Sequence, residues 1–387
     1  MEMGSLTCSC LSASDEASFS VHITHVGLHD FRNYEDWVLT PDSPLTVLCG
    51  PNAVGKTNVV EAIQIVATGA SFRRPIWDET IRWGADAASI SMVAEGDGSF
   101  AEVEVRIKRD GAREWRVGGV PRRRMADTCR FVPVVTFTPD DLLLAKGAAE
   151  HRRSTLDTLG EQLSTTYGAL RRDYTRAVRH RNAVLRDGGA DGELGPWDEQ
   201  IVKLGARLHT HRRGLAARVR HAMMPAYSHL SGGESLDLHV SDRCGVSNPD
   251  PSTELSLSAI EGALKDELVR RASEERARGV SLVGPHRDDI TFMVDGRDAR
   301  TYGSQGQQRT IALAWKLAEV AVIKEVLRRS PILLLDDVMS ELDDSRRAAL
   351  TGLVQQDTQT FVTTTTTTYF EPALLSDARV IQLGGAG

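Results

Sequence analysis

The segment from Gly50 to Thr57 reads GPNAVGKT and fits the pattern G-x-x-x-x-G-K-[ST] of a phosphate-binding loop. In such a loop, backbone N–H groups curl around a phosphate at the start of a helix, where the helix dipole favours negative charge. The Lys56 ammonium would neutralise phosphate oxygens of ATP, and the Thr57 hydroxyl would bind Mg²⁺. The expected nucleotide contacts are Gly50, Pro51, Asn52, Ala53, Val54, Gly55, Lys56, Thr57 and Asn58.

A pair of carboxylates near the other end of the chain fits the same chemistry. The stretch ILLLDD places four apolar residues before Asp336 and Asp337, as a buried strand would that delivers acids to its C-terminal end. We expect Asp336 to hold Mg²⁺ and Asp337 to polarise the attacking water. A strand that ends in a helix-capping acid would explain one carboxylate but not the pair. We therefore predict that Lys56, Asp336 and Asp337 are catalytic.

Two stretches compete for the signature motif with which ABC-type ATPases reach the nucleotide of a partner subunit. LSGGE begins at Leu230, and SQGQQ begins at Ser304. In ABC-type heads one helix separates the signature from the acidic strand. Ser304 lies 32 positions before Asp336, whereas Ser231 lies 105 positions before it and is followed by SLDLHV, which has a period of two. We predict a turn entering a strand for LSGGE and assign the signature, with Ser304 as a catalytic residue, to SQGQQ. A helix cap without a ligand is the alternative for Ser304.

The elements between these motifs predict an α/β fold. Short alternating runs lead into the phosphate loop from residue 21, an amphipathic helix follows it, and residues 88–139 alternate like antiparallel strands with Asp-Gly and Gly-Gly turns. Residues 150–225 are rich in Leu, Ala and Arg, which predicts two long helices joined by the loop RDGGADGELGPW. Further segments predict strands near 236–240 and 290–294, a helix over 308–329, the acidic strand, a helix in RAALTGLVQQ, and strands in TFVTTTTTT and ARVIQL.

The resulting fold class is an ABC-type P-loop ATPase head with a mixed sheet and a helical arm, or lid, inserted between the phosphate loop and the signature. The predicted divisions are a disordered tail over 1–20, the first part of the head over 21–149, the arm over 150–280, and the rest of the head over 281–387.

Composition narrows the class of protein. The chain has 387 residues, 41% of them apolar, and no apolar run approaches the roughly 20 residues that span a bilayer, so we expect no membrane segment. The first 20 residues lack the basic and apolar regions of a secretory signal. Five scattered cysteines suit a reducing cytoplasm, and we interpret Cys8 and Cys10 as free thiols because no second ligand pair accompanies them.

Together these motifs resemble the RecF family of bacterial recombination mediators, whose heads resemble those of SMC proteins. The similarity covers residues 21 to the end, which makes the first 20 residues an extra tail or a misplaced start. Segments in the family's order are DFRNYEDWVL, GPNAVGKTNVVEAI, GASFR, RNAVLR, PWDEQIVKLGARL, GPHRDD and SQGQQRT.

The resemblance implies a cytoplasmic, nucleoid-associated protein that binds ATP and Mg²⁺ and forms an ATP-dependent homodimer, in which Ser304, Gly306 and Gln307 engage the partner's nucleotide. It implies binding of double-stranded DNA at junctions with single-stranded gaps, and cooperation with RecR and RecO to load RecA in repair, replication restart and the SOS response. It also places Arg32 and Arg73 near the nucleotide, although surface ion pairs explain either arginine nearly as well.

Two departures from transporter-type cassettes predict slow hydrolysis. The segment TFTPDD stands where a glutamine-bearing loop is usual but has no glutamine. No histidine follows His286, so a threonine would replace the switch histidine after TFVTTTT. A nucleotide-switched scaffold without hydrolysis is an alternative, because Asp337 stands where relatives outside the family often have Glu. An ABC ATPase subunit of another assembly is a further alternative. For GPHRDD, a turn before a strand and a functional segment explain the sequence equally well.

Basic residues support a role in DNA binding. The net charge is −7, yet residues 151–220 hold 14 Lys and Arg against 8 Asp and Glu. Such residues bind phosphates without reading sequence. Solvated helix faces with i,i+4 partners would account for about half of them. The predicted DNA contacts are Arg122, Arg123, Arg124, Arg171, Arg172, Arg179 and Arg181, and the arm adds Arg152, Arg153, Arg212 and Arg213.

Overall fold

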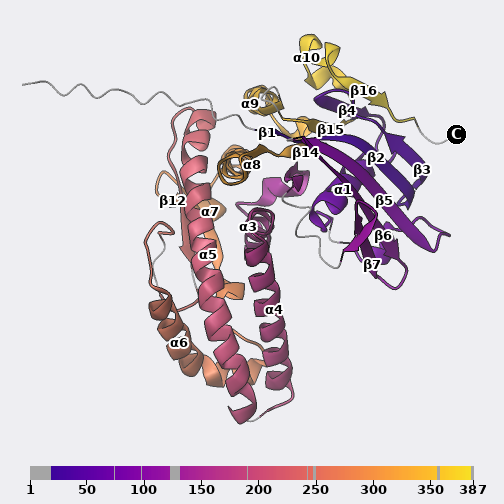
Figure 1. Ribbon diagram of the computed structural model, residues 1–387. Coiled ribbons are helices and arrows are strands. Elements are labelled where there is room, and N and C mark those ends of the chain that lie inside the picture. The colour runs from indigo at the N-terminus through magenta and orange to yellow at the C-terminus, as the bar shows by residue number, and fades with distance from the viewer. Residues whose placement is uncertain are drawn as a thin grey trace, which may run out of the picture.

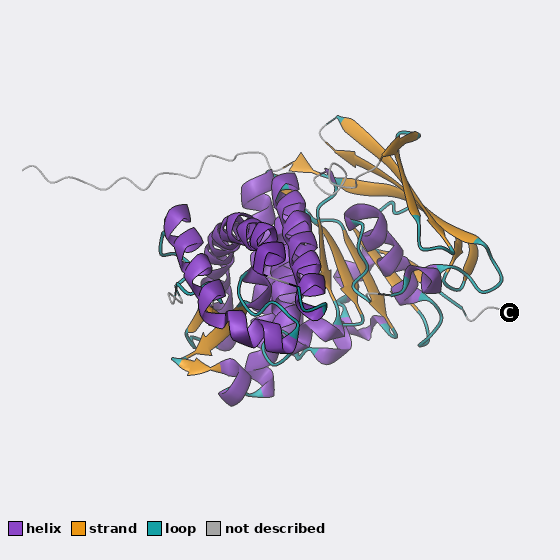
Figure 2. Cartoon of the chain, turned by 90° about the horizontal axis from the view of Figure 1, so that it is seen from below, coloured by secondary structure: helices purple, strands orange, loops and turns teal. Residues whose placement is uncertain are grey.

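Two β-sheets with a helix between them form a head, and long helices form an arm beside it (Figure 1). The computed structural model describes residues 19–73, 75–96, 98–122, 131–189, 191–241, 243–246, 250–354 and 358–384. Figure 2 shows the two sheets gathered on one side and most of the helices on the other. The predicted α/β head with a helical arm is confirmed.

The first sheet has five parallel strands, in the order β16-β4-β15-β14-β9. Its strands are β4 (Leu45–Cys49), β9 (Val134–Phe137), β14 (Ile332–Asp336), β15 (Thr360–Thr364) and β16 (Arg379–Gln382). Every residue of β4, β14 and β15 is buried, which explains their apolar or β-branched runs. The prediction that the whole of 88–139 forms antiparallel strands was wrong for β9, which pairs in parallel with β14.

The second sheet is antiparallel, in the order β3-β2-β5-β6-β7-β8. Its strands are β2 (His22–Phe31), β3 (Tyr34–Leu39), β5 (Ala87–Gly96), β6 (Ser99–Lys108), β7 (Arg113–Val117) and β8 (Val120–Arg122). Helix α1 (Lys56–Thr68) lies between the two sheets and buries seven apolar residues in the core there. Apolar residues of α1 and of both sheets form one core, which fixes the start of α1 relative to the strands.

The arm contains α3 (Ala149–Leu163), α4 (Thr165–Arg186), α5 (Asp191–Ser231) and α6 (Leu257–Arg278). Where the sequence predicted a single helix before the glycine-rich loop, the chain breaks at Ser164, whose hydroxyl accepts a hydrogen bond from the backbone N–H of Tyr167 and caps α4. The predicted loop is also shorter, since α5 already begins at Asp191 and includes Pro196.

The GPHRDD segment leads into a small three-stranded sheet on the arm. Its strands are β10 (Leu236–Ser241), β11 (Asp289–Val294) and β12 (Arg297–Asp298), and β10 pairs antiparallel with β11. The turn η3 (Pro285–Arg287) precedes β11. Because Val283 packs in the core formed by α4, α5 and α6, the arm extends past the predicted boundary at residue 280.

The chain returns to the head through α7 (Ala299–Tyr302) and α8 (Gln305–Leu327). The short β13 (Arg329–Ser330) pairs with β1 (Phe19–Ser20), so residues 19 and 20 of the predicted tail lie in a strand, while residues 1–18 lie outside the described ranges. The remaining elements are α9 (Asp344–Val354), α10 (Pro372–Ser376), η1 (Trp77–Thr80), η2 (Pro139–Leu143), η4 (Met339–Glu341) and η5 (Thr367–Tyr369).

Several arginines of the arm are buried in its interior. Arg212 is 7% exposed and holds Asp157 with two hydrogen bonds of 2.8 Å, and Arg152, at 1% exposed, holds Asp289 with bonds of 2.8 and 2.9 Å. These pairs join different elements instead of neighbours at i,i+4. They tie α3 to α5 and to β11, so much of the positive charge in the sequence stabilises the arm.

Within the described ranges, no helix combines the length and the apolar character that a membrane crossing requires.

Candidate nucleotide-binding site

The phosphate loop connects β4 to α1, as the sequence predicted. Gly55 has a φ of 112° and caps α1, and a Cβ there would lie 2.6 Å from the Asn33 side chain. At Gly50 a Cβ would lie 2.4 Å from the carbonyl oxygen of Leu383. Close packing therefore requires glycine at both positions. At Gly55 the backbone conformation requires it as well.

A small polar cavity of about 140 Å³ lies over this loop. Lys56 is 6% exposed, and its ammonium donates to the carbonyl oxygens of Gly50, at 2.6 Å, and Pro51, at 2.8 Å. The residues that line the cavity are Asn52, Ala53, Gly55, Lys56, Thr57, Asn58, Arg73 and Asp337. Backbone N–H groups at a helix start, with an ammonium and a guanidinium beside them, suit a phosphate chain.

The two predicted magnesium ligands lie together. Asp336 is the last residue of β14, and its carboxylate accepts hydrogen bonds from the hydroxyls of Thr57 and, at 2.8 Å, of Thr363. Burial raises the pKa of Asp336 in spite of these two donors and of the nearby Arg73 and Lys56. A carboxylate beside a threonine hydroxyl at the end of the phosphate loop is a donor set that fits Mg²⁺.

Asp337 lines the same cavity. Its φ of 51° is in the left-handed region, and its backbone N–H donates to the Thr363 hydroxyl at 2.9 Å. Burial raises the pKa of the Asp337 carboxyl against the effect of Lys56, and the neighbouring carboxylates Asp336 and Glu341 raise it further. The strained backbone turns this side chain toward the phosphate loop, where a base or a water-orienting group would act.

The sequence analysis missed Glu61, which organises both predicted arginines. Its side chain is fully buried and accepts two hydrogen bonds from Arg32, of 3.0 and 2.7 Å, one from Arg73 at 3.3 Å and one from Ser71 at 2.6 Å. Of these two arginines, Arg73 is among the described residues that line the cavity, whereas Arg32 is not and binds Glu61. Glu61 is the one acidic residue of α1, but its partners Arg32 and Arg73 lie outside the helix, so no local pattern indicated its role.

The signature residues lie at the start of α8. The Ser304 hydroxyl accepts from the backbone N–H of Gln307, and the Gln307 amide oxygen accepts from the backbone N–H of Ser304, a capping box. The Gly306 carbonyl accepts from Arg346 at 3.0 Å. None of Ser304, Gly306 and Gln307 is among the described residues that line the cavity of their own chain.

The LSGGE stretch was predicted to be a turn entering a strand, and this holds from Gly232, where positive φ at Gly232 and Gly233 leads the chain into β10, whereas Leu230 and Ser231 are the last residues of α5. The glutamate of LSGGE nevertheless contacts SQGQQ, the stretch to which we assigned the signature. The Glu234 carboxylate accepts from the Gln307 amide at 2.9 Å and from the Tyr227 hydroxyl at 2.9 Å. The turn thus positions a residue of SQGQQ, which the spacing of the two motifs gave no reason to expect.

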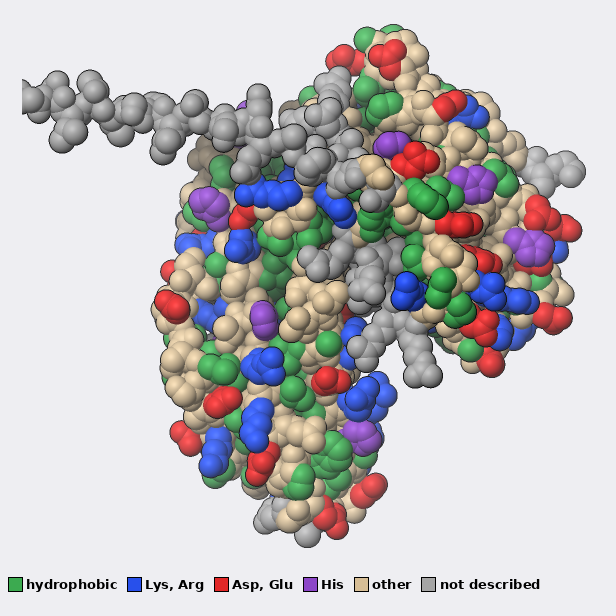
Figure 3. Space-filling model, in the orientation of Figure 1, with side chains coloured by type: hydrophobic (Ala, Val, Ile, Leu, Met, Phe, Trp, Pro, Cys, Tyr) green, Lys and Arg blue, Asp and Glu red, His purple; other side chains and the backbone are tan. Residues whose placement is uncertain are grey.

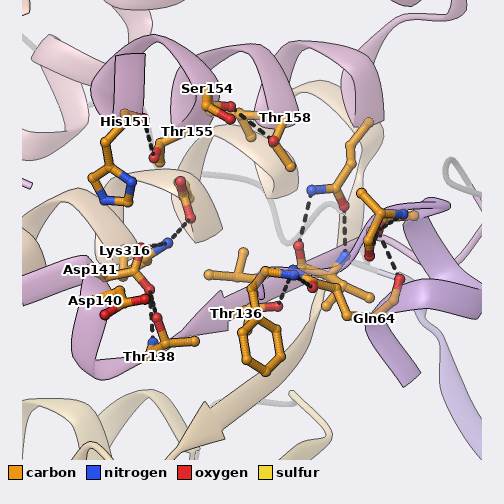
Figure 4. A pocket seen from close by; sticks show the side chains of 18 of the residues that line it. Gln64, Thr136, Thr138, Asp140, Asp141, His151, Ser154, Thr155, Thr158 and Lys316 are labelled. Carbon is orange, nitrogen blue, oxygen red and sulfur yellow. Dashed lines mark hydrogen bonds and ion pairs between the residues drawn. The ribbon is translucent and has the colours of Figure 1, made fainter. Parts of the chain in front are cut away.

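The arm meets the head around a second cavity, of about 560 Å³, shown in Figure 4. Lys316 of α8 binds Asp141 at 3.0 Å and Glu319 at 3.3 Å. Asp141 in turn accepts from the backbone N–H and the hydroxyl of Thr138, in the TFTPDD segment. Gln64 of α1 donates to Thr136 of β9 at 3.0 Å. Polar contacts therefore connect the nucleotide-side helix α1 and the signature helix α8 through one edge of the sheet.

The predicted DNA contacts fall into four groups, of which Arg181 forms the last. Arg172 and Arg179 are exposed on α4, and Arg122 is exposed on β8, whereas Arg123 and Arg124 lie outside the described residues. Arg171 is half-buried and binds Asp157 at 3.0 Å and Glu161 at 2.8 Å.

The prediction for Arg181 was wrong, because its side chain is 3% exposed and binds Asp198 at 2.6 Å and Glu275 at 2.7 Å. Its guanidinium holds α4 against α5 and α6 and is not presented to a ligand.

Comparisons with known proteins agree with this geometry. The family model described as RecF/RecN/SMC N terminal domain matches residues 22–382. A curated relative, DNA replication and repair protein RecF of Synechococcus sp. (strain JA-3-3Ab), is 38% identical over 94% of this chain and 96% of its own length. Another protein of that name, from Geobacillus thermodenitrificans (strain NG80-2), is 36% identical over 93% of this chain and 97% of its own length.

Among solved structures, the recombination mediator protein RecF with ATP superposes with a TM-score of 0.85 at 27% identity, over 92% of this chain and 95% of that one. An Smc head domain from Pyrococcus furiosus gives a TM-score of 0.53 at 14% identity over 94% of each chain, which shows a shared fold. Fold and motifs together define an ATPase head of the ABC type, related to the heads of SMC proteins. The chain belongs to the RecF family.

Asp336→Asn should stabilise the protein measured without nucleotide. Because burial raises the pKa of Asp336, its contribution to stability is present below the ordinary pKa of an aspartate and is lost as the pH rises through the raised value. The amide removes that loss, so we expect a higher Tm at neutral pH, together with loss of any stabilisation by Mg²⁺ and ATP. Thermal unfolding between pH 5 and 8 measures both effects.

Asp343→Asn is the matched control, because hydrogen bonding to the backbone N–H of Arg346 lowers the pKa of Asp343. Its contribution to stability is present above the ordinary pKa and is lost as the pH falls, so the amide should not stabilise the protein at neutral pH. A lower Tm for Asp336→Asn across the whole pH range would contradict the account.

Proposed function

We propose that this chain binds ATP with Mg²⁺ in the cavity over the phosphate loop and dimerises when it does so. Lys56 and Arg73 would bind phosphates, Thr57 and Asp336 would hold the metal, and Asp337 would orient the attacking water. The support is the convergence of these five side chains at one end of the parallel sheet.

The observation that carries the dimer is the position of the signature. Ser304 is exposed, has its hydroxyl and the N-terminus of a 23-residue helix at the surface, and lies outside its own chain's cavity. A helix start of this kind binds phosphate. In a two-fold dimer each subunit would offer Ser304, Gly306 and Gln307 to the nucleotide of the other, so each site is completed only by a second copy.

We propose that the dimer holds double-stranded DNA through the arm. Arg172, Arg176 and Arg179 are exposed on α4 with the spacing i, i+4 and i+7, which puts them on one face of the helix. Figure 3 shows Lys and Arg side chains on the arm and on the part of the head that faces it. Arginines on a rigid helix contact phosphates and set affinity without sequence preference.

The cellular role we propose follows the family. The related protein named as a recombination mediator in the RecFOR pathway supports a role at junctions of duplex and single-stranded DNA. There the chain would help RecR and RecO to load RecA for gap repair, replication restart and the SOS response, as a cytoplasmic, nucleoid-associated protein. Slow hydrolysis would time release from DNA, and Asp337 in place of a glutamate supports a weak ATPase.

Ser304→Arg should abolish ATP-dependent dimerisation, whereas Ser231→Arg should leave it within about twofold of the wild type. The first change puts a bulky cation at the proposed helix start for the partner's phosphates, and the second lies at the last residue of α5, before the turn that enters β10. Sedimentation with Mg²⁺ and ATP, with and without gapped duplex DNA, measures the dimer. Asp337→Asn should prolong it by slowing hydrolysis. Dimerisation that is lost in Ser231→Arg and kept in Ser304→Arg would assign the signature to LSGGE instead.

Replacement of both Arg172 and Arg179 by Glu should weaken duplex binding at least about tenfold and lower the slope of log K against log salt by about 2, since two phosphate contacts are lost. Arg270→Glu with Arg278→Glu is the matched control. These arginines are 67% and 62% exposed on α6 and carry the same change of charge. Fluorescence anisotropy over a salt series measures both variants. Equal losses in the two variants would show a general charge effect and contradict a site on α4.

A further inference from the structure

Three potential metal ligands meet in the interior of the arm, away from the nucleotide cavity. His209 comes from α5, Cys244 from the loop after β10, and Asp288 from the GPHRDD segment. His209 and Cys244 are fully buried and Asp288 is 3% exposed. Among the described residues this is the one group of three or more His, Cys, Asp or Glu side chains that could hold a metal ion, and their ligand atoms all lie within 4.8 Å of one another.

The distances fit the edges of a metal polyhedron, and the distance from His209 to Asp288 is long for a hydrogen bond. His209 Nδ1 lies 3.4 Å from Asp288 Oδ2 and 3.5 Å from Cys244 Sγ. An N–H donor to a carboxylate normally lies about 2.7–3.2 Å from it. In a tetrahedral zinc site, ordinary bond lengths place nitrogen about 3.4 Å from oxygen and about 3.6 Å from sulfur. Cys244 Sγ and the Asp288 carboxylate oxygen lie within 4.8 Å of each other, which is at most about 1 Å more than their separation in such a zinc site.

The surroundings hold these ligands in place. Asp288 Oδ1 accepts from the backbone N–H of Arg243 at 2.9 Å, which fixes the carboxylate and the residue before Cys244. Arg212 approaches Asp288 only to 4.0 Å, because its guanidinium is bound to Asp157. A thiolate and a carboxylate would neutralise a divalent cation, so the loaded cluster would carry no net charge into the buried interior.

We propose that His209, Cys244 and Asp288 form a binding site for a divalent transition metal, with zinc as the natural ion. Thiolate, imidazole and carboxylate together are the ligands of Zn²⁺ rather than of Mg²⁺ or Ca²⁺, and three protein ligands leave a fourth position for water. His209 Nε2 is buried without a hydrogen-bond partner. Because metal-bound imidazoles usually donate that second N–H, we expect an exchangeable ion and not a permanently bound one.

The ion would connect three parts of the arm that no disulfide joins. It would hold α5, the loop after β10 and the GPHRDD segment together, next to the contact between Tyr174 of α4 and His286, which is 2.7 Å long. GPHRDD would then act as a structural element through Asp288. The α4 helix that carries the exposed arginines packs on the same core, so metal binding would stiffen its support.

Titration of the full-length, EDTA-stripped protein with Co²⁺ under reducing conditions tests the site. We expect one equivalent to give the charge-transfer absorption of a cobalt–thiolate bond, Zn²⁺ to displace it, and Zn²⁺ to slow hydrogen exchange in peptides that contain His209 and Cys244. Cys244→Ser should abolish the absorption. Asp288→Asn keeps an acceptor for Arg243, and should retain the absorption but weaken affinity at least about tenfold.

Two controls separate this site from the other cysteines. Cys49→Ser removes the other described buried thiol, and Cys8→Ser with Cys10→Ser removes the C-x-C near the start of the chain. Both should retain the signal. Absence of the cobalt–thiolate absorption in the wild-type protein overturns the proposal, even if Cys244→Ser fails to fold. So does a signal that disappears with Cys8 and Cys10 and persists in Cys244→Ser.

Discussion

The nucleotide site depends on one threonine hydroxyl, that of Thr363, which lies between the Asp336 carboxylate and the backbone N–H of Asp337. Strand β15 lies between β4, which leads to the phosphate loop, and β14, which ends in the acids. From this central position the Thr363 hydroxyl donates to Asp336 and accepts from the backbone of Asp337. Since all three strands are parallel and buried, their carboxyl ends meet at one edge, and the packing of the sheet fixes the distance from Lys56 to both acids.

The arm follows a different principle. Its helices are joined by buried ion pairs such as Arg212 with Asp157 and Arg181 with Glu275, and removal of one partner from such a pair costs about 3–5 kcal/mol. Ion pairs of this kind have a fixed geometry, which keeps α4 in a defined position relative to the head. The contacts of Lys316 and Gln64 around β9 connect that position to the helices that start at the signature and at the phosphate loop.

The sequence was sufficient to predict the main elements of the head, because each motif specifies its element through residues that are close together in the chain. A glycine loop between strand and helix, two acids after an apolar run, and the spacing from Ser304 to Asp336 each specify an element and its end. The sequence was not sufficient where a side chain's role depends on distant partners. Arg181 and Arg172 look alike in the sequence, yet Glu275, nearly a hundred residues later, makes one of them structural. Glu61 and the parallel pairing of β9 were missed for the same reason, since both are set by tertiary contacts.

The most direct test of this account is calorimetric titration of Mg²⁺ and ATP into Thr363→Val, which keeps the shape of the side chain and removes its hydroxyl. We predict a loss of Mg²⁺-dependent ATP affinity of about tenfold or more, because a donor to Asp336 and an acceptor for the N–H of Asp337 are both removed. Thr360→Val, at the other end of β15, where the hydroxyl bonds only its neighbour Thr358 among the described contacts, should bind like the wild type. Wild-type affinity in Thr363→Val would contradict the central position of this hydroxyl.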